Sequence, residues 1–183
     1  MHDGPLFRRL TLPALLVSLA LMLSAVERLF SLDLLLPVPG LRLGLPNIVT
    51  LFALWALPAK TALLILVLRC VLASLFGGGA SALIFSLSGG LLAFVVMWAL
   101  FPLEGKRLSA AGISVAGAAA HNVGQLLAAR VVMGTAAVFG YLPFLLLGSV
   151  LTGLATGAAF LAMRPALLRT PWMQALQREK HRP

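Results

Sequence analysis

Long runs of apolar residues, separated by short polar breaks, follow one another along most of the chain. Their lengths predict six membrane-spanning helices, at about residues 11–30, 46–59, 60–76, 80–101, 109–133 and 138–163. The runs are continuous rather than alternating, which argues against a transmembrane β-barrel. The second run is the weakest, because it is short and Pro58 interrupts it. The pattern therefore predicts an all-α polytopic membrane protein.

Composition agrees with that fold class and divides the chain into two parts. Of the 183 residues, 61% are hydrophobic and 10% are charged, and a soluble domain of this length needs far more polar surface. We expect one six-helix transmembrane domain at residues 1–166 and a basic cytoplasmic tail at residues 167–183. In that tail, Trp172, Met173 and Leu176 predict the apolar side of a short helix lying on anionic lipid.

The basic residues indicate how the helices cross the membrane. With the N-terminus in the cytoplasm, ten of the 14 Lys and Arg residues fall on the cytoplasmic side. This asymmetry follows the positive-inside rule and predicts that both termini are cytoplasmic. It also accounts for the formal net charge of +9, so we expect the lipid bilayer, and no nucleic acid, as the partner of the basic segments.

Polar residues interrupt the fifth predicted span. Residues 112–133 read GISVAGAAAHNVGQLLAARVVM and carry His121, Asn122, Gln125 and Arg130. Polar side chains are costly in hydrocarbon, so they usually face a bundle interior or a wet cavity. His121 and Gln125 are one helical turn apart and share a face. This span is the first candidate wall of a binding site.

Other predicted spans carry polar residues that could meet this wall. Arg69 lies in the third span, Glu27 ends the first, and Asn47 begins the second. If the spans form one bundle, these groups converge on a polar pocket that opens outward. Its excess of arginines suits an anionic group such as a carboxylate or a phosphate.

The same residues allow a purely structural interpretation. Glu27 could pair with Arg69 or Arg130 merely to hold helices together. His121 could equally donate a hydrogen bond between helices rather than contact a ligand. The sequence leaves both alternatives open.

Several enzyme classes lack their signature in this sequence. The five acids, Asp3, Glu27, Asp33, Glu104 and Glu179, are far apart, so no aspartate-rich motif binds the magnesium–diphosphate of a prenyl synthase. There is no Walker A, GxSxG or HExxH motif. His, Cys and carboxylates do not cluster as metal ligands do. We therefore expect a protein that is not an enzyme and that has no metal or cofactor.

Small residues recur at positions where helices can approach closely. Ser149, Gly153 and Gly157 share one face of the sixth span, and Gly89 and Gly90 are adjacent in the fourth. In lipid, such small residues allow close helix packing. Ala14 and Ser18 form a similar pair on the first span.

Five segments together resemble a known family. They are RLGLPNIVT at 42–50, LLILVLRCVLASLFGG at 63–78, LSGGLLAFVVM at 87–97, AGAAAHNVGQLLAA at 116–129 and YLPFLLLGSVLTGLATG at 141–157. They resemble the Gx transporter family, which is also catalogued as heptaprenyl diphosphate synthase component I. That family is similar to the S components of energy-coupling factor transporters, which are six-helix substrate-binding subunits of bacterial inner membranes.

The resemblance implies a function, partners and a site. It implies that the chain binds a small vitamin-like or anionic substrate near the outer face, beneath a loop at residues 31–45. Arg69, His121, Asn122, Gln125 and Arg130 are the primary ligand-facing candidates, with Glu27 and Asn47 secondary. It further implies a membrane T component, docked on Ala14 and Ser18, and two ATPase subunits that supply energy.

Two other functions remain open from the sequence. The first is a non-catalytic accessory membrane subunit in heptaprenyl diphosphate or quinone metabolism, or in a membrane redox system. The second is a free-standing carrier that works as a homo-oligomer.

Overall fold

The structure is a computed structural model that describes residues 5–29, 44–171 and 173–174, and this part of the chain is helical. Six α-helices follow one another: α1 (Pro5–Leu29), α2 (Asn47–Ala56), α3 (Ala59–Ala73), α4 (Gly79–Leu100), α5 (Ala110–Met133) and α6 (Leu142–Leu168). Short helical turns connect them: η2 (Ser74–Gly78), η3 (Phe101–Leu103) and η4 (Ala136–Tyr141). Within the described residues there is no β-strand, so the predicted all-α class and six helices are confirmed.

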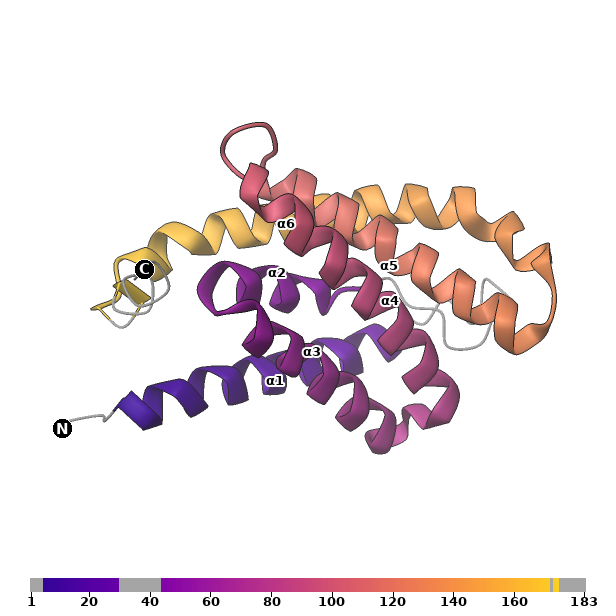
Figure 1. The fold of residues 1–183 in the computed structure, drawn as a ribbon, viewed down its shortest axis with the longest axis horizontal. Helices are drawn as coiled ribbons and strands as arrows, with labels where there is room; N and C mark the ends of the chain where they lie inside the picture. Colours follow the sequence, from indigo (N-terminus) through magenta and orange to yellow (C-terminus); the bar gives the residue numbers. More distant parts are fainter. Residues whose placement is uncertain (1–4, 30–43, 172, 175–183) are drawn as a thin grey trace.

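The helices run back and forth along the long axis of the molecule. α1 begins and α6 ends at the same end of the bundle, which we call the terminal end (Figure 1). The junction of α2 with α3 and the connection between α4 and α5 also lie toward this end, whereas η2 and η4 lie toward the opposite end (Figure 1). This alternation is the arrangement that a bundle with both termini on one side of a membrane requires.

Four helical segments are long and apolar enough to cross a membrane: Leu10–Leu29, Ala59–Phe76, Gly79–Leu103 and Ala136–Leu168. α5 is not among these four, although its 24 residues make it about 36 Å long. The length of α2 departs further from the expectation of a second membrane-spanning helix than α5 departs from that of a fifth. It has ten residues, hence a length of about 15 Å, roughly half of the hydrocarbon thickness.

Close helix contacts hold α4, α5 and α6 together, and they are made by the predicted Gly153 and Gly157 and by Gly124, which the sequence did not single out. A Cβ added at Gly153 would lie 2.5 Å from the Cα of Val115, and one at Gly157 would lie 2.5 Å from the Cα of Ala111. One at Gly124 would lie 2.7 Å from the backbone oxygen of Ser88. These distances leave no room for a side chain, so the backbones of the three helices are in contact.

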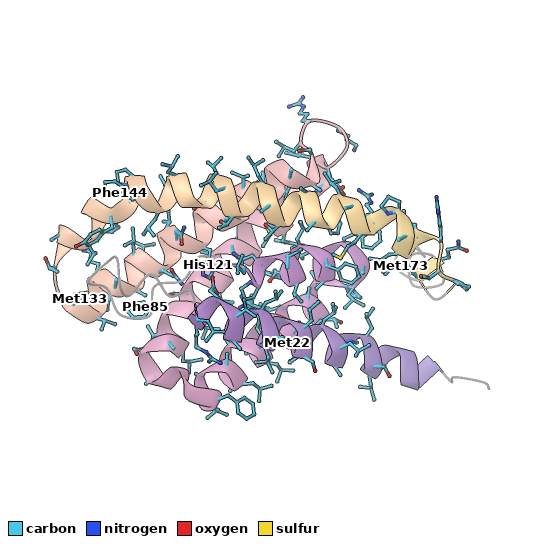
Figure 2. The ribbon with its side chains drawn as sticks, turned by 180° about the vertical axis from the view of Figure 1, so that it is seen from behind. Met22, Phe85, His121, Met133, Phe144 and Met173 are labelled. Atoms are coloured by element: carbon cyan, nitrogen blue, oxygen red, sulfur yellow. The ribbon has the colours of Figure 1, made fainter. Side chains whose placement is uncertain are left out.

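Apolar side chains occupy both the core and the outer surface. Trp55 is buried between Phe52 and Phe160, with ring centroids 5.6 and 5.7 Å away. On the outside, Met22 of α1 and Phe144 of α6 are exposed (Figure 2). An apolar exterior over an equally apolar core is expected where lipid replaces water as the solvent.

The end of the chain departs from the expected membrane-surface helix. Met173 is fully buried and belongs to the main hydrophobic core, at the terminal end of the bundle (Figure 2). Its side chain therefore packs against the helices instead of facing lipid, which corrects the interpretation of Met173. Trp172, Leu176 and residues 177–183 lie outside the described residues, as do residues 31–43 of the predicted loop.

Replacing Gly153 by Ala should destabilise the protein by about 1–3 kcal/mol, because the new methyl group forces α5 and α6 apart. Gly148→Ala is the matched control on the same helix, since a Cβ there meets nothing within 4 Å. SDS titration of the purified variants in mixed micelles measures both. Equal stability of the two variants would contradict the close contact.

Candidate functional site

Five helices direct buried polar side chains toward the middle of the bundle. We call five of these residues the polar cluster: Glu27 of α1, Asn47 of α2, Arg69 of α3, and His121 and Gln125 of α5. The exposed fraction of each is 4% or less. His121 lies between the helices, away from both ends of the bundle (Figure 2). All five residues were among those predicted from the sequence.

Glu27 holds the segment that leads into α2. Its Oε1 accepts hydrogen bonds from the backbone N–H groups of Gly44 and Leu45, the latter at 3.1 Å. The backbone N–H of Asn47 then donates to the carbonyl of Gly44 at 2.9 Å, which starts the helix. A carboxylate near a helix N-terminus is electrostatically favourable. Glu27 thus sets where α2 begins.

Gly44 brings this entry segment against α5. A Cβ at Gly44 would lie 2.7 Å from Nδ2 of Asn47 and 3.2 Å from Cδ2 of His121. Gly44 also has a φ of 85°, a conformation that glycine adopts without strain. Both facts require glycine here, and they make Asn47 and His121 neighbours.

The pair Gly89–Gly90 of α4 lies between Arg69 and the α5 residues. A Cβ at Gly89 would lie 2.8 Å from the backbone oxygen of His121 and 2.9 Å from Cγ of Gln125. A Cβ at Gly90 would lie 3.4 Å from Nη2 of Arg69. His121 and Gln125 are themselves joined by a 3.0 Å hydrogen bond between their Nε2 atoms.

Arg69 differs from the other buried polar residues because its charge is not balanced by the described residues. Its Nε and Nη2 atoms are buried and have no hydrogen-bond partner there, and no carboxylate forms an ion pair with it. Breaking or omitting the partner of a buried charge is strongly unfavourable. The predicted pair of Arg69 with Glu27 is therefore not formed.

Three buried neutral residues also have polar atoms without partners in the described part of the chain. Both amide atoms of Asn47 and the hydroxyl oxygens of Ser24 and Ser86 are buried and make no hydrogen bond. Ser86 lies one turn before Gly90 on the same face of α4. Ser24 lies one turn before Arg28, which donates to the carbonyl of Ala73, one turn after Arg69.

Ser24 and Gly44 were not among the predicted site residues. The sequence could have indicated Ser24, because it precedes Glu27 by three residues and therefore shares its face of α1. The sequence could not have indicated the role of Gly44, because that role depends on how the segment before α2 meets His121.

The amide nitrogen of Asn122, a predicted site residue, is directed toward α6. Its Nδ2 donates to the backbone oxygen of Leu145 at 3.0 Å and to Oγ of Ser149 at 2.8 Å, both on α6. Adjacent residues on a helix point about 100° apart, so His121 and Asn122 meet different neighbours. The amide nitrogen of Asn122 joins α5 to α6.

Arg130 also lies outside the polar cluster. Its side chain is exposed, and its guanidinium carbon lies 6.0 Å from the centroid of the Phe139 ring. Of the two arginines predicted for the site, Arg69 is therefore buried and Arg130 is exposed.

The predicted docking pair is on the outer face of α1. Ala14 and Ser18 are both exposed, and Oγ of Ser18 donates to the backbone oxygen of Ala14 at 3.0 Å. Within the described residues, no group of three or more His, Cys, Asp or Glu side chains could hold a metal ion.

Comparison with known proteins gives one match. A family model described as heptaprenyl diphosphate synthase component I matches residues 16–163. No curated protein and no solved structure matches the chain.

If Asn122 joins α5 to α6, a double-mutant cycle with Ser149 should reveal a coupling. We expect Asn122→Ala and Ser149→Ala to show a coupling energy of about 0.6–2 kcal/mol in SDS unfolding, the range for hydrogen bonds between membrane helices. Thr152→Ala is the control partner, because Oγ1 of Thr152 donates within α6, to Gly148. Additive effects of the first pair would refute the contact.

Proposed function

The chain belongs to the heptaprenyl diphosphate synthase component I family, and from that premise we propose that it is a substrate-binding membrane subunit. In this role it lies in the bacterial cytoplasmic membrane and captures a small anionic, vitamin-like molecule from outside. Its function is similar to that of the S component of an energy-coupling factor importer. The observation that carries the proposal is the buried guanidinium of Arg69, whose Nε and Nη2 have no hydrogen-bond partner among the described residues.

The energetic cost of Arg69 favours a ligand. An arginine within a membrane helix is expensive to bury, and such residues mark substrate or ion pathways by default. A bound anion supplies the missing counter-charge and accepts hydrogen bonds from Nε and Nη2. Asn47, Ser24 and Ser86 offer further hydrogen bonds to the rest of that molecule.

The position of the polar cluster favours entry from the outer side. Glu27 is two residues from the end of α1, and Asn47 is the first residue of α2. Both ends lie away from the terminal end of the bundle. With cytoplasmic termini, as the positive-inside rule predicts, a molecule approaching from outside reaches these residues first.

Import requires partners that supply energy. We propose a membrane T component and ATPase subunits, with the T component docking on α1 at Ala14 and Ser18. Their exposure supports this assignment, because small residues allow a second helix to approach closely in lipid.

A second candidate function follows from the description of the family. The chain could be an accessory, non-catalytic subunit in heptaprenyl diphosphate or quinone metabolism, with the polar cluster holding an intermediate for another enzyme. The family description supports this alternative, and it uses the same buried arginine.

Replacing Arg69 by Met should separate stability from binding. Without ligand, Arg69→Met should be as stable as the native protein or more stable by about 1–4 kcal/mol, since an uncompensated buried charge is removed. Native mass spectrometry of the gently purified variant should show loss of the small molecule that the native protein retains.

Arg28→Met is the matched control for this experiment. Arg28 donates to the carbonyl of Ala73, so its loss should lower stability and leave binding intact. A large loss of stability in Arg69→Met, with the small molecule still retained, would show that Arg69 is structural.

Copurification distinguishes the two candidate functions. We expect the tagged chain, solubilised in mild detergent, to recover a T component and ATPases, and Ala14→Leu with Ser18→Leu to abolish their recovery by closing the approach to α1. Recovery of a prenyl synthase or redox subunit without an ATPase would support the accessory function instead.

A further inference from the structure

We infer that the polar cluster binds the carboxylate of a singly charged molecule, and that it does not bind a phosphate or a diphosphate. This inference rests on the proposed function and names the substrate class of that site. Three observations carry it: the number of buried charges, the edge of the guanidinium that lacks partners among the described residues, and the buried neutral groups that also lack them.

The buried charges leave one positive charge to be matched. Among the described side chains, Glu27 and Arg69 are the two charged residues that are buried. Glu27 is matched by the N–H groups of Gly44 and Leu45 and by the positive end of α2. Arg69 remains, and a ligand with one negative charge neutralises it.

The other charged side chains that the structure describes are not buried. Arg28 donates to Ala73, and Arg130 is exposed beside Phe139. A phosphate dianion or a diphosphate would bring further negative charge into the bundle without a second buried cation among the described residues, which is unfavourable in a low-dielectric interior.

The shape of the unpartnered edge of Arg69 also favours a carboxylate. Nε and Nη2 lie on the same edge of the guanidinium plane, and both are buried without a hydrogen-bond partner in the described chain. Their two N–H bonds are parallel, and this fork matches the two oxygens of one carboxylate.

The neutral groups define the rest of the molecule. The amide of Asn47 can donate one hydrogen bond and accept another, and the hydroxyls of Ser24 and Ser86 can do both. These groups suit hydroxyl or amide substituents. The substrate class is thus a small hydroxy- or amide-bearing monocarboxylic acid.

Thermal unfolding of the full chain in lipid nanodiscs, followed by tryptophan fluorescence, tests the inference. The probes are sodium lactate, acetate, phosphate and diphosphate, each compared with sodium chloride at the same ionic strength and without magnesium. We expect lactate to raise the unfolding midpoint by about 2–4 °C at a concentration several times its dissociation constant. Phosphate and diphosphate should raise the unfolding midpoint no more than chloride does.

Variants show whether the effect comes from this site. Arg69→Met should lose the shift with lactate, and Asn122→Ala, which faces α6 instead, should keep it. Glu27→Gln retains an oxygen that can accept from Gly44 and Leu45 but removes one negative charge, so it should gain a shift with phosphate. An unchanged lactate shift in Arg69→Met would overturn the assignment.

The outcomes separate this inference from the proposed function. A larger shift with diphosphate than with lactate, lost in Arg69→Met, would overturn the carboxylate class and keep an anion site at Arg69. No Arg69-dependent shift with any probe, and no retained small molecule in native mass spectrometry, would overturn both. A retained compound that contains a carboxyl group and no phosphorus would support the inference.

Discussion

The contact between α4 and α5 at Gly89 and Gly124 is the constraint on which the centre of this protein depends. Because neither residue has a Cβ, the backbone of one helix touches the backbone of the other. This closeness places His121 and Gln125 against Gly89, while Gly90, the next residue of α4, lies against Arg69. A side chain at Gly89 would separate the helices and move the imidazole away from the segment that begins α2. The polar cluster is therefore a consequence of backbone packing between two helices.

The short α2 is the second element that shapes the site. Its first residue, Asn47, lies beside His121 rather than at an end of the bundle, so irregular backbone enters the interior just before it. Such backbone is tolerated at membrane depth only when its polar groups are satisfied by protein or water. Glu27 satisfies the N–H groups of Gly44 and Leu45. One carboxylate on α1 thereby allows a helix to begin inside the bundle.

Hydrogen bonding divides the buried polar residues into two kinds. Asn122 donates to α6, and Oγ of Ser114 lies 2.7 Å from Oγ1 of Thr156. Arg164 forms an ion pair with Glu104, and its guanidinium also lies over the ring of Trp55. These residues hold elements together. Arg69 and Asn47 make no such contact within the described chain, and this difference assigns them to the proposed ligand. Burial alone would not have separated the two kinds, because all except Glu104 and Arg164 are equally inaccessible.

The sequence by itself determined the helices, the small residues at their close contacts and the polar positions that face inward, because apolar periodicity and the cost of polar groups in lipid act locally along the chain. Arg69, His121 and Gln125 were identifiable on those grounds. Only the tertiary structure decided which neighbour each inward face meets. Asn122 turned toward α6, Arg130 came to lie outside the cluster, and Glu27 bound the backbone of Gly44 and Leu45 rather than Arg69 or Arg130. Helical periodicity specifies directions within one helix, whereas the rotation and depth of its neighbours depend on packing across the whole bundle.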